Sequence, residues 1–162
     1  MKMSLPGITV KRVILFSYLL GFLWVLGYDY PLYAAESPAQ TVRVRIGTIL
    51  ASNQSDEIDP KLDAMRSQLK VMKYRSYRLI KEETQNVLWQ SNAAFDIPGG
   101  RSLMVTPQES RGSQLALKVR LQHGDKPIVD TTVRLNSGGN FLLGGPQHEG
   151  GVLVLSIWAT AQ

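Results

Sequence analysis

The stretch LALKVRLQHGDKPIVDTTVRL, from Leu115 to Leu135, decides the fold class. Apolar and polar residues alternate through both of its ends, and a period of two is typical of a strand that buries one face. Between these ends, HGDK places Gly124 and Asp125 at the centre of a compact hairpin turn. The stretch therefore predicts two antiparallel strands that send one row of residues each into a core: Leu115, Leu117, Val119 and Leu121, then Val129, Thr131, Val133 and Leu135.

Other runs of strand length lie on both sides of this hairpin. Residues 41–50 (TVRVRIGTIL) and 140–143 (NFLL) each indicate one strand. Residues 74–90 indicate two strands, or one long bent strand, with a turn at Lys81–Asn86. Residues 152–159 (VLVLSIWA) close the sheet and are apolar on both faces at first, which favours a central position for that strand.

Proline and glycine end several of the predicted strands. Residues 91–100 end in Pro-Gly-Gly and are expected to be irregular or a short edge strand, and the strand at 102–107 is expected to stop at Pro107. The octet GGPQHEGG, residues 144–151, does not suit a phosphate cradle, because no helix follows it and no lysine is near. It does not suit a metal loop either, because its one histidine and one glutamate are adjacent and point apart. Its glycines permit positive φ and a close approach of another backbone, so we interpret it as the connection between the last two strands.

One helix is predicted among the strands. Asp59 suits an N-cap and Pro60 the first helical position. An apolar stripe follows at spacings of three and four residues: Leu62, Met65, Leu69 and Met72. We therefore expect a mainly β (α+β) fold, an antiparallel sandwich or partly open barrel of about seven to nine strands with one short helix (about 60–72) packed on it.

The N-terminal segment has the pattern of a secretory signal. A basic segment, residues 1–12, precedes an uncharged apolar run, 13–28, and small residues follow at Ala34 and Ala35. As a helix the apolar run spans roughly 24 Å, short of the ~30 Å hydrocarbon core, which favours a cleaved signal peptide over a permanent anchor. With either outcome, the basic residues place the rest of the chain outside the cytoplasm, in the periplasm or envelope of a bacterium.

The chain accordingly divides into a signal peptide or membrane anchor (1–35), a short linker (36–40) and a single β-rich exported domain (41–162). The formal net charge of the 162 residues is +5, and the part after residue 35 holds 15 basic and 12 acidic residues. This excess is too mild to favour nucleic-acid binding, which is typically marked by a clustered basic face. The linker and the start of the first strand, residues 36–46, are a plausible exchangeable sheet edge.

The residue pattern predicts no cofactor and no metal. There are no cysteines, which excludes disulfides, thiol catalysis and a lipoprotein anchor. The two histidines, His123 and His148, lack the further ligands that a zinc site needs. Oxygen-bearing residues crowd one loop without the spacing of a calcium site: Asn53, Ser55, Asp56, Glu57 and Asp59.

Four residues are the candidate contacts with a partner or ligand: Arg43, Arg45, Tyr77 and Trp158. Arg43 and Arg45 occupy the polar face of the first strand, where they either bind an anionic partner or form the solvated face of an outer strand. Tyr77 would supply a polar contact in a pocket between sheet and helix. Trp158 ends the last strand and is either a contact or a core residue.

The run TTVRLNSGGNFLLGG, residues 131–145, resembles the strand-turn-strand near the C-terminal end of bacterial secretins, the outer-membrane pores of secretion and pilus systems. In that family an apolar strand follows the Gly-Gly, and Val152–Trp158 corresponds to it here. The resemblance implies an envelope-associated β module. The exported part is far too short for a secretin's periplasmic modules and pore, so no activity is transferred from the family.

We therefore expect a non-enzymatic β-rich module that binds or scaffolds other envelope proteins, with no nucleic-acid partner and with membrane contact only through residues 13–28 if the signal is retained. A periplasmic domain that binds a small ligand, with Arg43, Arg45 or Tyr77 as contacts, is the alternative. A small hydrolase is a third option without a supporting motif.

N-terminal sequencing of the protein purified from cells tests the signal. We expect the mature chain to begin directly after Ala34 or Ala35, because signal peptidase cleaves behind small residues. A chain that begins at Met1 would instead identify the apolar run as a retained anchor.

Overall fold

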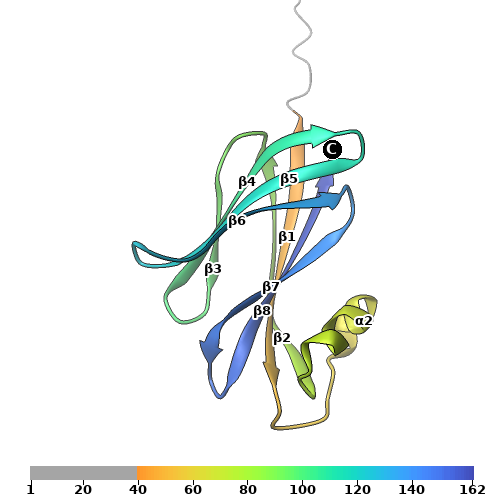
Figure 1. Ribbon diagram of the computed structural model, residues 1–162, viewed down its shortest axis with the longest axis vertical. Coiled ribbons are helices and arrows are strands. Elements are labelled where there is room, and N and C mark those ends of the chain that lie inside the picture. The colour runs from red at the N-terminus through yellow and green to blue at the C-terminus, as the bar shows by residue number, and fades with distance from the viewer. Residues whose placement is uncertain (1–39) are drawn as a thin grey trace, which may run out of the picture. The chain divides into compact units, whose positions relative to one another are not determined.

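The computed structural model describes residues 40–162, so the predicted signal or anchor lies outside the described residues. Within this part, eight strands form two four-stranded antiparallel sheets, in the orders β2-β1-β8-β7 and β3-β4-β5-β6 (Figure 1). The strands are β1 (Thr41–Ser52), β2 (Ser76–Leu88), β3 (Ala93–Ile97), β4 (Arg101–Arg111), β5 (Gln114–His123), β6 (Lys126–Asn136), β7 (Asn140–His148) and β8 (Gly151–Ala161). The predicted mainly β fold and strand number are confirmed, and the sheets form a sandwich, not a partly open barrel.

The main core lies between the two sheets. The β5–β6 hairpin predicted from the sequence contributes most of its alternate residues as expected: Leu115, Leu117, Val119 and Leu121 are all buried, and Val133 and Leu135 are 8% exposed. Val129 and Thr131, also predicted in the core, are half-buried. From the other sheet, β1 and β8 face them with Val44, Ile46, Leu153, Leu155 and Ile157. One face of each sheet is therefore mainly apolar and buried, and this alternation helps to set the register of the strands.

A helical segment covers the outer face of the β2-β1-β8-β7 sheet near one end. It runs as η2 (Pro60–Met65), α2 (Arg66–Leu69) and η3 (Lys70–Met72). The predicted helix at 60–72 is thus confirmed in extent, although only α2 is α-helical. The Asp59 side chain caps it, since its Oδ1 accepts a hydrogen bond from the Lys61 N–H at 2.9 Å. The tighter 3₁₀ turn aligns residues three apart, which stacks Leu62 and Met65 on the sheet.

The helical segment explains why β1 and β8 are apolar on both faces. Ile49 and Ala51 of β1 and Val154 of β8 lie beneath the segment and form a second core cluster with Leu62 and Leu69. The predicted central position of β8, between β1 and β7, is confirmed. The prediction of an exchangeable edge at residues 36–46 is wrong for residues 41–46, because β1 pairs with β2 on one side and β8 on the other, and residues 36–39 lie outside the described residues.

Two predicted breaks are absent from the strands. Of the two alternatives for residues 74–90, one long strand is confirmed, whereas the expected turn at Lys81–Asn86 is wrong, because β2 runs unbroken to Leu88 and only bulges at Ile80. The strand expected to stop at Pro107 continues to Arg111 in β4. Pro107 is tolerated because β3 pairs with β4 only as far as Val105, so the missing N–H faces no strand.

Polar residues of β2 protect the edge of the opposite sheet. Lys81 and Gln85 face inward from β2, and their side chains donate hydrogen bonds to the carbonyl oxygens of Asp96 (3.1 Å) and Ala94 (2.9 Å) on β3. Glu83 stands between them, and hydrogen bonds from Gln85 and then Lys81 lower the pKa of its carboxyl. The polar run Lys81–Asn86, which has the composition of a turn, therefore includes a row of inward side chains that covers the edge strand β3.

The octet 144–151 is split between strand and turn. β7 extends through Gly144 and Pro146 to His148, with a register shift against β8, and the turn is confined to Glu149 and Gly150, both with positive φ. It does connect the last two strands, as predicted, but with a much shorter loop. A Cβ on Gly151 would lie 2.5 Å from the Ala51 carbonyl oxygen, so the closely approaching backbone is that of β1. No helix within residues 40–162 is long and apolar enough to cross a membrane.

Tyr77→Phe tests the bond between the helical segment and the sheet. The Tyr77 hydroxyl donates to the Leu69 carbonyl oxygen at 2.6 Å in the second core cluster. Its removal takes away this bond and the one that the hydroxyl accepts from the Tyr74 N–H at 3.2 Å, so we expect the free energy of unfolding to fall by about 1–3 kcal/mol. Chemical denaturation measures the loss, and Tyr74→Phe, which removes a hydroxyl outside this bond, is the matched control.

The pH dependence of the same variant provides a second readout. Burial raises the pKa of the Tyr77 hydroxyl, so the neutral phenol is favoured in the folded state. Its contribution is complete below the ordinary tyrosine pKa and is lost as the pH rises through the raised value. The stability difference between wild type and Tyr77→Phe should therefore narrow above about pH 10. A difference that stays constant in that range would contradict this assignment.

Candidate functional site

An arginine stacked on a tryptophan marks the uncovered part of the outer face of the β2-β1-β8-β7 sheet. Arg45 of β1 is paired with Trp158 of β8 in the antiparallel ladder, so their side chains leave the sheet next to each other. The guanidinium carbon of Arg45 lies 4.7 Å from the centre of the Trp158 ring. This distance allows cation–π attraction, which holds Arg45 in place before any partner arrives.

A shallow hollow of about 560 Å³ surrounds this pair. Its walls come from three adjacent strands, because Arg43 is also on β1, Thr84 pairs with Arg45 from β2, and Thr160 pairs with Arg43 from β8. We call this region the Arg–Trp surface and define it by six of its lining residues: Arg43, Arg45, Glu82, Thr84, Trp158 and Thr160.

The Arg–Trp surface is electropositive. Two of the residues that line the hollow are arginines, and the one carboxylate among them is Glu82. Arg43 is exposed and donates a hydrogen bond to the Gln162 side-chain oxygen at 3.0 Å, while Arg45 is half-buried against the indole. The planar guanidinium groups keep further N–H donors in a fork that matches a carboxylate. The surface is therefore suited chemically to an acidic group beside an apolar one.

The structure brings together three of the four candidate residues and separates the fourth. Arg43, Arg45 and Trp158 lie in the Arg–Trp surface, with Trp158 half-buried at the border of the second core cluster. Tyr77 is 1% exposed and lies beneath the helical segment. The exposed fraction of Tyr77 leaves little surface for a partner, and its hydroxyl is used by Leu69.

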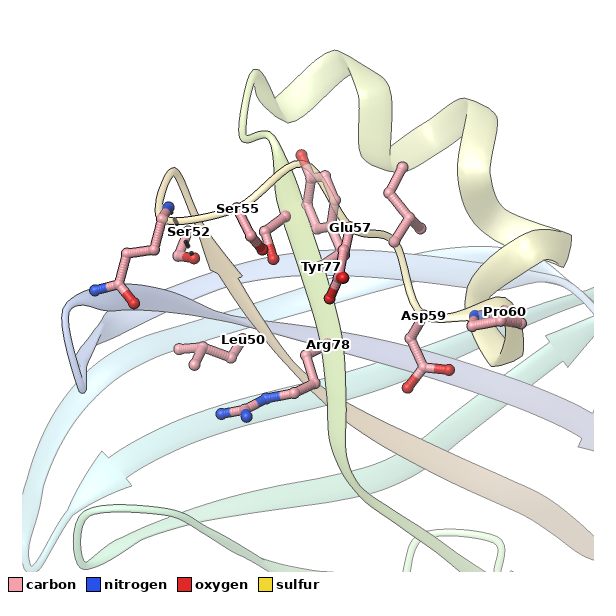
Figure 2. Close-up of a pocket in the computed structure, with 11 residues that line it drawn as sticks. Leu50, Ser52, Ser55, Glu57, Asp59, Pro60, Tyr77 and Arg78 are labelled. Carbon is pink, nitrogen blue, oxygen red and sulfur yellow. Dashed lines mark hydrogen bonds between the residues drawn. The ribbon is translucent and has the colours of Figure 1, made fainter.

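A second hollow, of about 620 Å³, lies where the loop before the helical segment passes β2 (Figure 2). In Figure 2 the Tyr77 ring points toward the helical segment, whereas Leu50 and Arg78 lie on the other side of the strand. Glu57 and Asp59 supply carboxylates to its lining. This hollow contains Tyr77 but neither Arg43 nor Arg45, so the three predicted ligand contacts do not share one pocket.

Two residues of the oxygen-rich loop, Asn53 and Asp56, have structural partners, and the two histidines lie apart. Asp56 forms an ion pair with Arg75 at 3.0 Å, and the Asn53 side-chain oxygen accepts from the Arg75 N–H. His123 ends β5 in one sheet and His148 ends β7 in the other. Within residues 40–162, no three histidine, aspartate or glutamate side chains are grouped as a metal site.

Sequence reasoning missed Glu82 and Thr84, which complete the Arg–Trp surface from β2. They were assigned to a turn, whereas the alternation of Glu82, Thr84 and Asn86 with inward residues is a strand signal. Their approach to Arg45 depends on the pairing of β1 with β2, which links residues about forty positions apart and leaves no local pattern in the sequence.

Comparisons with known proteins give one partial structural match. No protein-family model matches the chain, and no curated protein matches its sequence. Among solved structures, the chain is similar to the T2SS secretin XcpQ from Pseudomonas aeruginosa, with a TM-score of 0.37 and 11% identity. The match covers 76% of this chain and 56% of the secretin chain. The expected resemblance to secretins is thus present as a weak and local one, and it carries no functional argument.

Arg45→Met tests whether the stacked arginine is held by the ring. Methionine keeps the aliphatic packing on Trp158 but removes the charge, so we expect the free energy of unfolding to fall by roughly 0.5–1 kcal/mol. The matched control is Arg43→Met, since Arg43 contacts a side-chain amide instead of a ring. Denaturant unfolding of both variants measures the difference, and equal losses would show that the ring does not hold Arg45.

Proposed function

We propose that the chain is a non-enzymatic binding module of the bacterial cell envelope that contacts another envelope protein through the Arg–Trp surface. The observation that carries the proposal is the stacking of Arg45 on Trp158 in an uncovered electropositive hollow. The partner segment that fits this chemistry carries a carboxylate next to an apolar side chain.

The residue types of the surface support protein binding. Tryptophan and arginine are enriched among the residues that supply most of the energy at protein interfaces. An arginine already held against a ring loses less side-chain freedom on binding than a free one. The neighbouring Arg43 is exposed, and its charge would attract an acidic partner at a distance and fix its orientation.

The proposed envelope location is supported by the sequence of residues 1–35, which has the order of a secretory signal. In this proposal the β-rich part from residue 41 is the exported domain and residues 36–40 are the linker. If the apolar run at 13–28 is retained, it tethers the module to the inner membrane, and if it is cleaved, the module is free in the periplasm.

A small-ligand-binding domain is the second candidate function, and the hollow at the start of β2 favours it. That hollow combines Glu57 and Asp59 with Arg78, so it would suit a small ligand that carries both charges. The two candidates use different arginines, which makes them separable by substitution.

Affinity capture from native envelopes tests the proposed function. The tagged full chain is compared with the Arg43→Met/Arg45→Met double variant, and Arg111→Met, an exposed arginine at the end of β4, is the matched control. We expect capture of the partner to fall at least about tenfold in the double variant and to remain in the control. Binding should also weaken as salt rises.

The same experiment separates the alternatives. Capture that is equal for wild type and double variant would contradict the proposed contact surface. Small-molecule binding that survives the double variant but is lost in Arg78→Ala would favour the hollow at the start of β2.

A further inference from the structure

The four edge strands of the sandwich differ in how their free sides are protected. The free side of β3 receives hydrogen bonds from Lys81 and Gln85. Tyr77 of β2 exchanges backbone hydrogen bonds with the loop at Glu57 and Asp59, and β2 then bulges at Ile80. An exposed edge that is covered or irregular in these ways resists pairing with another strand.

β7 and β6 lie at the edges on the other side of the sandwich. β7 is interrupted by Pro146 and a register shift, and Arg101 donates a hydrogen bond to the Gln147 carbonyl oxygen at 3.3 Å. In contrast, the segment of β6 from Val129 to Leu135 is regular, and within residues 40–162 its backbone is bonded only to β5. β6 therefore has a regular edge that is left without such protection. Residues 82–88 of β2 are also paired only with β1 in the described part of the chain, but their inward side chains Glu83 and Gln85 are polar, whereas those of β6 are mainly apolar.

The core is also thinner on this side. Val129, Phe141 and Leu143 pack against the main core from β6 and β7 but are only partly buried. Val133 and Leu135 are among the most exposed members of that core, at 8%. A strand placed beside β6 would bury these apolar groups as well as pair the free backbone groups.

The sequence of β6 is complementary to itself when read in reverse. In VDTTVRL, residues 129–135, Asp130 and Arg134 stand at equal distances on either side of Thr132. Thr131 and Val133 are likewise symmetric about Thr132, as are Val129 and Leu135. We propose that β6 pairs with β6 of a second copy of this chain, antiparallel and centred on Thr132, to form a two-fold dimer with one continuous eight-stranded sheet.

The charges on the outer face agree with this register. Asp130 of each copy would lie opposite Arg134 of the other, and opposite charges in directly paired positions stabilise a sheet. Within one copy, Asp130 already pairs with Arg120 at 2.7 Å, and Arg134 reaches Glu109 at 3.6 Å across the small Ala116. The dimer therefore joins these pairs into a row of alternating sign across the interface, from Glu109 and Arg134 of one copy to Asp130 and Arg120 of the other.

The inward side chains of the two β6 strands also agree with this register. With Thr132 opposite Thr132, Val129 lies opposite Leu135 and Thr131 opposite Val133, all on the face that points into the sandwich. The large apolar side chains of Val129 and Leu135 thus meet each other, and both charged positions meet opposite charges. A strand of another protein would have to match this pattern, whereas a second copy matches it by symmetry.

This interface goes beyond the proposed function, because it uses the other sheet. Pairing through the β6 edge leaves the outer face of the β2-β1-β8-β7 sheet uncovered, so each dimer would present two Arg–Trp surfaces. Two linked surfaces bind a repetitive partner more tightly than one does, through the raised effective concentration of the second contact.

Charge reversal tests the dimer, with the mass of the full chain in mild detergent measured by light scattering and sedimentation. In a homodimer, Asp130→Arg places two arginines opposite each other, and Arg134→Asp places two aspartates opposite each other. We expect each variant alone to weaken dimerisation at least about tenfold. An equimolar mixture should dimerise again, because the Asp130→Arg chain and the Arg134→Asp chain are complementary at both positions. This rescue also shows that the variants are folded.

A single cysteine tests the register, since the chain has none of its own. Thr132→Cys would place two thiols on directly opposed residues, whose Cα atoms are roughly 4.5–5.5 Å apart, within disulfide range. We expect it to form a disulfide-linked dimer under mild oxidation, and Asn86→Cys, exposed on the β2 edge, to form little.

Three results would overturn the proposal. They are a wild-type chain that stays monomeric up to its solubility limit, dimerisation that is unaffected by both charge reversals, and cross-linking at Asn86→Cys in place of Thr132→Cys. None of these outcomes depends on the Arg–Trp surface, so the two proposals fail separately.

Discussion

The fold depends on the pairing of β1 with two neighbours at once. β1 lies between β2 and β8, and so joins the beginning of the described chain to its end. Because it is central, its inner side chains pack against the second sheet, and its outer ones must be covered or tolerate water. The helical segment covers Ile49 and Ala51, while Arg43 and Arg45 emerge beyond it. The candidate surface is thus the part of the central strand that the helical segment does not reach.

The two sides of the sandwich show different solutions to the problem of unpaired strand edges. On the side of β2 and β3, inward Lys81 and Gln85 bond to the backbone of the opposite sheet. This arrangement uses polar groups at positions that would otherwise be core, and it is stable because each donor has a carbonyl acceptor. On the side of β6 and β7, Val129, Phe141 and Leu143 are only partly buried, and within residues 40–162 the outer edge of the regular part of β6 has no partner strand. The edge of β3 is thus covered by side chains of β2, whereas the edge of β6 is available to pair with another strand.

The two proposed contacts occupy different sheets and rely on different physics. The Arg–Trp surface offers side chains, with a charge held in place by an aromatic ring. The β6 edge offers backbone groups, and its side chains select the register through charge and apolar pairing. A module with both would be able to assemble with itself and still present its side-chain surface to another protein.

The sequence by itself determined the class of fold, the β5–β6 hairpin, the central place of β8 and the helical segment with its Asp59 cap, because each depends on local periodicity or turn chemistry. It misplaced a turn at Lys81–Asn86, because a row of inward polar residues has the composition of a loop when its hydrogen-bond partners on β3 are not known. It also treated β1 as an edge, since strand order follows from contacts between residues far apart in the chain. Only the tertiary structure placed Arg45 on Trp158, buried Tyr77 and left β6 at an open edge, because these results depend on which strands pair and on which face the helical segment packs.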